Sequence, residues 1–562
     1  MNHVLVIING ADIGPAANLA ATLPSYSVVT CDPILVDQIQ AAGLAAPRFL
    51  PWLDCPPYNQ LDPAAHAAVD AFERGLDAAL APLLPGVSLQ GWQHLNLYYQ
   101  WLAMTWYGPL WKALAPVLDG AHVHVFVCDV PGSFYYNSFL APTLLMWQLK
   151  VRGIEFSGYT YGALDDDADV IADLAGRYPH KGAGDILVHV PTCMYDLAYF
   201  HGEAQASGKH LSNYTAKKFH MPLPAQRVVP LANAEAALRA MPAVLQQQIT
   251  AAVAAIEAAL EAYLAPLLEL PYYRQRQSQH LARLYRSQLV MYFELLRHHA
   301  EGRPEKLLLS DHDTGFHGPL VAFARHFGLP VLMVPHAKTS AYVEFNYRNI
   351  TVLSHPLQGT EVCHAGGQVL PHGRLAYPER FTADSELKPL RTLSLLLNAP
   401  SLNGIYYTRW DAYLDGIKRI ADWCEQHGVT LKLRCKPSYS IVRLLASELG
   451  MDIDTLIANA RETMDEHVAG CDLCLMYDTP TSALLYFLRN GVPVLNTVVD
   501  QLSPSELSMG NPSLVPPESV IVTLRRLDLF LHDPASLAAW RSSQFRAYLQ
   551  LFEAARPLRQ YL

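Results

Sequence analysis

Short apolar runs alternate with longer helix-like segments along most of this chain. Clear examples of such runs are Lys306–Ser310, Pro330–Val334 and Leu473–Tyr477, and polar residues follow each of them. Short apolar runs separated by helical patterns are typical of parallel βαβ units. The sequence therefore predicts an α/β fold with parallel sheets. The other predicted strands are Val4–Ile8, Val123–Cys128, Ile186–Val190, Thr351–Leu353, Thr392–Leu397, Thr430–Arg434, Pro493–Asn496 and Val520–Val522.

Two regions interrupt this alternation. Residues 60–120 are rich in Ala, Leu and Trp, and residues 234–300 contain the Ala-rich run QQQITAAVAAIEAALEAYL. Both regions have helical periodicity, and a second helix from about Arg274 to His299 carries several Arg and Tyr residues. We expect helical insertions at both places, because an amphipathic helix buries one face against a neighbouring layer.

A domain boundary is predicted within the polar segment FTADSELKPLR, at residues 381–391, because a new strand follows it directly. The chain length allows two large domains. We expect two Rossmann-like domains at residues 1–385 and 386–533, with both helical insertions in the first. A closing helix is expected at residues 534–562.

Composition excludes several classes of protein. Hydrophobic residues make up 51% of the 562 residues and charged residues only 16%, so the chain is not largely disordered. The net charge of −10 argues against a nucleic-acid partner. We find no run of about 18 uncharged apolar residues, and therefore expect no membrane-spanning helix and at most peripheral membrane contact. The nine cysteines and the strand-like start MNHVLVIINGAD favour a reducing, cytoplasmic location over a secreted one.

The densest polar cluster follows two successive predicted strands. Asp311, His312 and Asp313 come directly after the first strand, and His336 and Lys338 come shortly after the second. Neighbouring parallel strands would place these groups at one edge of a sheet, where carboxylates and imidazoles serve as nucleophiles, acids or bases. Helix capping by Asp313 is the alternative. The spacing of Asp311 and Asp313 also suits a metal, but no clear third ligand is near, so we expect no metal or other cofactor.

A second cluster, in the C-terminal part, suits a phosphate group. A helix start with hydroxyl groups binds anions, and cationic side chains on a neighbouring loop add to this attraction. Capping of the same helix is the alternative. The chain has no GxGxxG or GxxxxGK[ST] motif in a strand–helix context, which disfavours dinucleotide oxidoreductases and P-loop NTPases. The predicted nucleotide-binding residues are Asn398, Ser401, Arg434, Lys436, Pro437, Ser438, Thr481 and Ser482.

Weaker candidates follow other strands. Asp12 and Asp129 lie after two N-terminal strands, and His355 and Arg374 lie near the ends of two later ones. Each is a candidate contact for a sugar or an acceptor. A purely structural turn is at least as plausible at each of these positions.

Residues 306–530 resemble GT-B glycosyltransferases that use CMP-activated nonulosonic acids. In those families a His-Pro or basic-Pro pair contacts the nucleotide phosphate, and a Ser/Thr pair follows at a later helix start. Lys436-Pro437 and Thr481-Ser482 match this order, although Lys replaces the usual His of the sialyltransferases. The stretch FARHFGLPVLMVPHA is similar to an element of capsule and wall-polymer transferases. The most similar family is that of the retaining β-Kdo transferases of lipopolysaccharide and capsule synthesis.

The resemblance implies a GT-B-like fold, with an acceptor-binding and catalytic first domain and a donor-binding second domain. It implies transfer of a Kdo-type sugar from a CMP donor to an oligosaccharide or glycolipid at the inner face of the bacterial inner membrane. Asp311 or Asp313 would be the nucleophile of a retaining reaction, whereas an inverting reaction would use His336 or an Asp as base. Lys338, Arg348 and Arg374 are the candidates for binding the sugar carboxylate. A UDP-sugar epimerase and a glycan-binding scaffold protein remain the alternatives.

Overall fold

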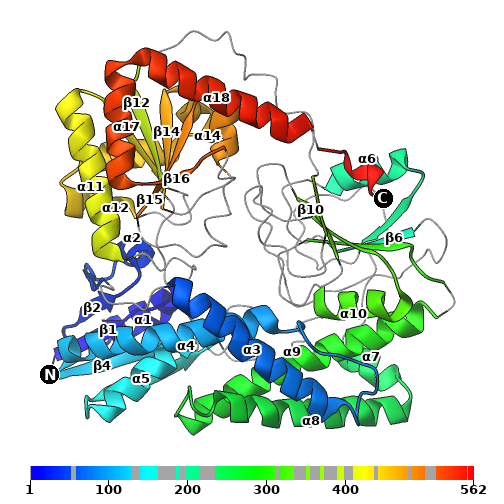
Figure 1. Cartoon of the computed structure of the whole chain (residues 1–562). Coiled ribbons are helices and arrows are strands. Elements are labelled where there is room, and N and C mark those ends of the chain that lie inside the picture. The colour runs from blue at the N-terminus through cyan, green and yellow to red at the C-terminus, as the bar shows by residue number, and fades with distance from the viewer. Residues whose placement is uncertain are drawn as a thin grey trace.

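The computed structural model describes most of the 562 residues. The described residues are 2–51, 58–128, 140–162, 185–189, 197–213, 234–300, 302–310, 317–334, 350–354, 368–371, 389–397, 409–435, 441–478, 483–499, 514–553 and 555–562. Three parallel sheets, each covered by helices, form the architecture (Figure 1). The predicted α/β fold with parallel, Rossmann-like sheets is therefore confirmed.

The first sheet has the strand order β3-β2-β1-β4-β5, which is the Rossmann order 3-2-1-4-5-6 without its sixth strand. The chain leaves β1 in one direction and returns to the other side of it with β4, so the topological switch point lies between these two strands. The strands are β1 Asn2–Val6, β2 Ser27–Thr30, β3 Arg48–Phe49, β4 Ala121–Cys128 and β5 Phe156–Tyr161.

The second sheet has six parallel strands in the order β11-β10-β9-β8-β6-β7. Its switch point lies between β6 and β8, which pair in parallel with His189 opposite Leu309. Its strands are β6 Asp185–His189, β7 His210–Asn213, β8 Lys306–Ser310, β9 Val331–Val334, β10 Thr351–Ser354 and β11 Gln368–Pro371.

The third sheet has the order β13-β12-β14-β15-β16, with its switch point between β12 and β14. Two of the three sheets thus precede the predicted boundary, which falls outside the described residues and stays a prediction. The strands of the third sheet are β12 Thr392–Leu397, β13 Thr430–Cys435, β14 Leu473–Tyr477, β15 Val494–Val498 and β16 Pro517–Ser519.

One predicted strand is wrong. Val520–Val522 does not form a strand but begins the helix α17, Val520–His532. The Ser519 side chain caps this helix by accepting a hydrogen bond from the Val522 backbone N–H. Val520 is buried, whereas Ile521 and Val522 are 50% and 42% exposed. Three consecutive β-branched residues therefore lie on a helix start, and the nearby strand β16 lies just before them.

Helices fill both regions where insertions were predicted. In the first region α3 (Tyr58–Leu80) packs against α4 (His94–Leu114), and in the second α8 (Ala243–Leu264) packs against α9 (Pro271–His298). These four helices share one hydrophobic core with the first two sheets. Other helices before β12 are α1 Ile13–Ala20, α2 Pro33–Ala41, α5 Ala141–Val151, α6 Leu197–Ala206, α7 Ala234–Ala240 and α10 His317–Phe327.

Among the described residues, α8 is the one helix that is long and apolar enough to cross a membrane by length and composition. This is weak evidence, because core helices of packed domains meet the same criteria. The buried stripe of α8 consists of Ile249, Ala252, Ile256, Leu260 and Leu264. These residues belong to the large N-terminal core, and 22% of the apolar 18-residue window of the helix is buried.

The part of the chain that forms the third sheet, here called the C-terminal unit, contacts the parts that form the first and second sheets, here called the first and second units. Phe49 of the first unit packs edge-on against Trp410, with ring centroids 5.1 Å apart. The Arg443 backbone N–H lies 3.5 Å from an Asp37 carboxylate oxygen at the α2–α12 contact. The C-terminal helices are α11 Trp410–His427, α12 Val442–Leu449, α13 Ile453–Arg461, α14 Met464–Ala469, α15 Leu484–Arg489 and α18 Pro534–Glu553.

The chain ends on the second unit. After α18 crosses the top of Figure 1, the short 3-10 helix Leu558–Gln560 packs against α6. The Leu558 backbone N–H donates to the Tyr199 hydroxyl over 3.3 Å. The Lys306 ammonium donates to the Tyr561 carbonyl over 2.6 Å. The tail therefore joins the third sheet's unit to the second sheet.

Candidate functional site

Most of the predicted site residues lie outside the described residues. The strand arrangement that the main prediction needs is nevertheless present, because β8 and β9 pair in parallel with Ser310 opposite Val334. The catalytic and binding roles stay predictions for Asp129, Asp311, His312, Asp313, His336, Lys338, Arg348, His355, Arg374, Asn398, Ser401, Lys436, Pro437, Ser438, Thr481 and Ser482.

Arg434 is one of two predicted site residues that the structure describes. It lies near the end of β13 and is buried. Its guanidinium donates to the backbone carbonyls of Glu462, over 2.6 Å, and Asn459, over 3.3 Å. These bonds tie β13 to the end of α13. Arg434 therefore stabilises the local fold through these two backbone carbonyls. Its predicted contact with a phosphate stays a prediction.

Asp12 is the other, and it lies at the switch point of the first sheet. One of its carboxylate oxygens accepts hydrogen bonds from the backbone N–H groups of Ile8, over 3.0 Å, and Asn9, over 2.8 Å. The Asn9 side chain in turn accepts from the Ala11 N–H over 2.9 Å. These bonds form a capping box that fixes the loop after β1.

The second Asp12 oxygen faces the end of another strand. The Tyr161 hydroxyl, on the last residue of β5, donates to it over 2.6 Å. The Cys128 thiol, on the last residue of β4, lies beside the same hydroxyl. Three groups that ionise are thus collected from the carboxyl ends of β1, β4 and β5. Ligands of open α/β sheets bind outside this edge, at the switch point.

Burial dominates the electrostatics of this group. It raises the pKa of the Asp12 carboxyl to about 7, although hydrogen bonds from Tyr161, Asn9 and Ile8 oppose the rise. The pKa of the Tyr161 phenol is raised by burial and by the neighbouring carboxylate. A carboxyl group with a pKa near neutrality can accept and release a proton at physiological pH. Asp12 is only 1% exposed, so any such exchange passes through its hydrogen-bond partners.

The third sheet carries a strained residue at its own switch point. Asp478 directly follows β14 and has a φ of 68°, the only positive φ among the described residues other than glycine. Its N–H donates to the Thr497 carbonyl over 2.7 Å, and the residue is buried. A left-handed Asp is sterically costly and is found preferentially at functional sites. Asp478 lies three residues before Thr481, in the region predicted to bind phosphate, and no pattern in the sequence indicates its strain.

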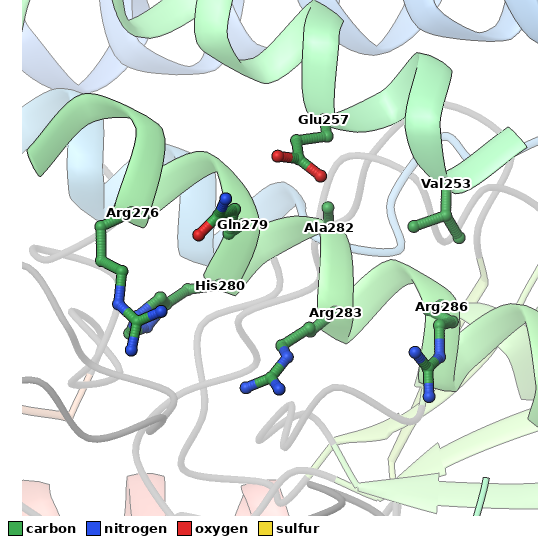
Figure 2. A pocket seen from close by; sticks show the side chains of 8 residues that line it. All are labelled: Val253, Glu257, Arg276, Gln279, His280, Ala282, Arg283 and Arg286. Carbon is green, nitrogen blue, oxygen red and sulfur yellow. The ribbon is translucent and has the colours of Figure 1, made fainter. Parts of the chain in front are cut away.

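A cationic pocket lies between α8 and α9, with a volume of about 270 Å³ (Figure 2). Arg276, His280, Arg283 and Arg286 line it from α9, and their spacing of three or four residues places them on one helix face. Figure 2 shows all four extending away from Glu257, the acidic residue of the lining. Helix geometry therefore gathers three guanidinium groups and an imidazole in a chain whose net charge is −10.

The chemistry of this pocket suits an anion. Arginine stays protonated at all physiological pH values, and its fork of N–H donors matches phosphate and carboxylate. Arg286 also forms an ion pair with Glu235 of α7. The sequence shows several Arg residues on this helix, and the spacing of three or four residues that they share with His280 is the signal that indicates the pocket.

The position of α9 connects this pocket with both N-terminal sheets. A methyl group added at Gly158, in β5, would lie 3.8 Å from the Tyr273 hydroxyl at the start of α9. Further along, α9 packs against α10 of the second sheet. The pocket residues therefore lie on a helix that spans from the first sheet to the second.

Comparisons with known proteins give a distant likeness. No protein-family model and no curated protein matches the chain. Similar solved structures include the spinosyn rhamnosyltransferase SpnG complexed with thymidine diphosphate, at 15% identity over 67% of this chain and 99% of that chain, with a TM-score of 0.33. MurG of Acinetobacter baumannii has 11% identity, covers 67% and 97% of the two chains and has a TM-score of 0.32. A UDP-N-acetylglucosamine 2-epimerase has 14% identity, covers 67% and 92%, and has a TM-score of 0.30. At these values the likeness assigns neither an activity nor a residue role to this chain.

Proposed function

We propose that this protein is a glycosyltransferase of the GT-B type that transfers an acidic, Kdo-type sugar from a CMP donor to a bacterial surface glycan. The observation that carries the proposal is the arginine-lined pocket of α9. The sugar of a CMP-activated nonulosonic acid has a carboxylate, and an acidic acceptor adds further anionic groups. Guanidinium groups on one rigid helix face suit such groups better than they suit a neutral sugar.

The arrangement of the sheets supports the same proposal. Each of the three doubly wound sheets offers a switch point, and strain at Asp478 and the raised pKa of Asp12 mark two of them. On this proposal the third sheet binds CMP, and Lys436 with the helix start at Thr481 and Ser482 binds its phosphate. The carboxylate that attacks the anomeric carbon is Asp311 or Asp313, after β8.

The role proposed for Asp12 is to hold a proton at the switch point of the first sheet, where the acceptor would bind. Its carboxyl group can exchange a proton near neutral pH, and Tyr161 connects it to the neighbouring strand end. An acceptor hydroxyl loses a proton during glycosyl transfer, so a network that holds a proton at this edge would assist the reaction.

Transfer from CMP-Kdo, generated in situ, to a synthetic glycan acceptor tests the proposal. We expect transfer by the wild-type protein and a loss of roughly tenfold or more in Arg276→Gln and Arg283→Gln, because charged hydrogen bonds to the substrate are lost. Arg297→Gln is the matched control, since Arg297 lies on the same helix but pairs with Glu294 at the surface. Equal activity of all three variants would remove the pocket from the mechanism.

Two further measurements separate the alternatives. Protection of the protein against heat by CMP but not by UDP supports the CMP donor, whereas the reverse result supports a UDP-sugar epimerase. Binding of neither nucleotide supports a glycan-binding scaffold protein. Asp311→Asn and Asp313→Asn test the nucleophile, and full activity of both variants would contradict a retaining mechanism that uses either residue.

A further inference from the structure

A cluster of metal-ligating side chains lies between α3 and α4, apart from the sites above. His66, Asp70 and Glu73 are separated by four and three residues and therefore share one face of α3. His94 is the first residue of α4 and faces them. Neither the predicted motifs nor the proposed function uses these residues.

The distances between the ligand atoms suit a single ion. His94 Nδ1 lies 3.1 Å from Glu73 Oε2 and 3.9 Å from Asp70 Oδ1. One ligand atom from each residue lies within 4.8 Å of the others. With metal–ligand bonds of about 2.1 Å, two ligands of a tetrahedral site are roughly 3.4 Å apart. Small side-chain movements would therefore place all three atoms around one ion.

The cluster is inside the protein rather than on its surface. The side chains of His94, Glu73 and Asp70 are 0%, 1% and 12% exposed. One Glu73 carboxylate oxygen accepts a hydrogen bond from the Gly91 N–H over 3.1 Å, and the other lies 3.1 Å from His94 Nδ1. A buried carboxylate is costly unless a positive charge compensates for it. A divalent cation would supply that charge.

A second, independent feature is the Tyr285 hydroxyl on α9. Tyr285 is fully buried, and its hydroxyl has no hydrogen-bond partner among the residues that the structure describes. It is close enough to Glu73 and Asp77 for their charges to act on it. A buried phenol without a partner is unusual, and an ion with its bound water would provide one.

The second ring nitrogen of His94 also makes a hydrogen bond of the kind that metal-binding histidines make. This nitrogen, Nε2, lies 3.0 Å from His66 Nδ1. If Nδ1 binds a metal, Nε2 carries the proton and donates it to His66. Such a hydrogen bond on the far side of the ring fixes the tautomer and orientation of metal-ligating histidines.

We propose that Asp70, Glu73 and His94 bind one divalent transition-metal ion, such as Zn²⁺ or Mn²⁺, which holds α3 and α4 together. A set of one imidazole and two carboxylates suits these ions, whereas Mg²⁺ and Ca²⁺ prefer oxygen ligands alone. Three protein ligands leave a position for water on the ion. The ion is structural, because its ligands are buried between helices.

The test uses the full-length protein, stripped with a chelator and then titrated with Zn²⁺, Mn²⁺ or Co²⁺. We expect one equivalent of Zn²⁺ or Mn²⁺ by elemental analysis, with a rise in melting temperature. Glu73→Gln and His94→Gln should lose this equivalent, and His66→Gln should weaken binding by about 10–100-fold. Absence of stoichiometric binding and stabilisation in the wild-type protein would overturn the proposal.

Two variants keep the test decisive if the buried ones fold poorly. Asp70→Asn removes the most exposed ligand, so it should fold and still lose most of the affinity. Asp77→Asn is the matched control on the same helix: Asp77 accepts hydrogen bonds from Ser88 and the Leu89 N–H, and its loss should lower stability without removing the metal. Full metal content in folded Asp70→Asn and Glu73→Gln would equally contradict the site.

Discussion

The Tyr161 hydroxyl donates a 2.6 Å hydrogen bond to the Asp12 carboxylate, across 149 residues of sequence. It joins the end of β5 to the loop after β1 at the switch point of the first sheet. Because the bond favours the ionised carboxylate, it opposes the effect of burial on the Asp12 pKa.

Asp12 should make stability depend on pH in a defined direction. Its pKa is about 7 in the folded protein against 3.8 as a free side chain, so the folded state binds the proton more tightly. Its contribution is therefore present below about pH 4 and is lost as pH rises to about 7, by up to about 4 kcal/mol. Asp12→Asn should flatten the dependence of unfolding free energy on pH in this window. Denaturant unfolding from pH 4 to 8 measures it, and an unchanged slope would contradict the raised pKa.

Tyr161→Phe should raise the Asp12 pKa further, because the variant removes a hydrogen bond to the charged form. Titration of the Asp12 carboxyl by NMR or infrared spectroscopy would follow this change. Tyr159→Phe is the matched control in the same strand, because its hydroxyl contacts His124 instead. Equal Asp12 titration in the wild type and Tyr161→Phe would mean that the bond has no electrostatic effect.

His467 should act in the opposite sense. Burial lowers its pKa to about 4, so folding favours the neutral ring. The stability due to this residue is present above about pH 6.5 and is lost as pH falls toward 4, by up to about 3 kcal/mol. His467→Gln should reduce this acid sensitivity, as measured by urea unfolding between pH 4 and 7. A wild-type acid slope in the variant would assign the loss to other groups.

Ser394 should be structural, although its contacts resemble a catalytic triad. Its hydroxyl lies 2.8 Å from His467 Nε2, and His467 Nδ1 lies 2.9 Å from Glu462. Ser394 is fully buried in β12, so no substrate reaches it. We expect no labelling by a fluorophosphonate and a lower melting temperature in Ser394→Ala without loss of transfer. Labelling of Ser394 would show that the site opens.

Gly318→Ala should destabilise the contact between α10 and the helical insertion. A methyl group there would lie 2.6 Å from the Cα atom of Trp92, which is buried backbone that cannot easily move. We expect a loss of about 1–3 kcal/mol in urea unfolding. Gly202→Ala in α6 is the control, because nothing lies within 4 Å of its added methyl group, and it should be neutral or stabilising by up to about 1 kcal/mol. Equal effects would contradict the tight contact.

Two variants of Asp478 distinguish the effect of its strained backbone from the effect of its side chain. Asp478→Gly removes both the side chain and the strain of its positive φ, whereas Asp478→Ala removes the side chain alone. The glycine variant should be more stable than the alanine variant by about 1–2 kcal/mol. Both should lose activity to a similar extent if the side chain serves the donor site. Equal stability of the two variants would mean that the backbone relaxes.

Local sequence determined where most strands and helices lie. A strand that helices cover on both faces is apolar along its whole length, so runs of about four to six apolar residues indicate such strands. Leu473–Tyr477 and Thr392–Leu397 were located to the residue for this reason. Val520–Val522 was wrong because the cap at Ser519 outweighs the strand preference of β-branched residues. Arginine spacing on α9 was visible, but its meaning depends on what α8 and α9 enclose.

Tertiary structure alone decided how the strands are divided among three sheets, and which distant residues meet. Parallel strands pair through backbone hydrogen bonds that carry no sequence signature, so the split between β5 and β6 cannot be read from apolar runs. The Asp12–Tyr161 bond and the cluster of Asp70, Glu73 and His94 arise only when separate elements pack together. Burial raises the pKa values of Asp12, Tyr161 and Glu73, and burial is a property of the folded chain and not of any segment of it.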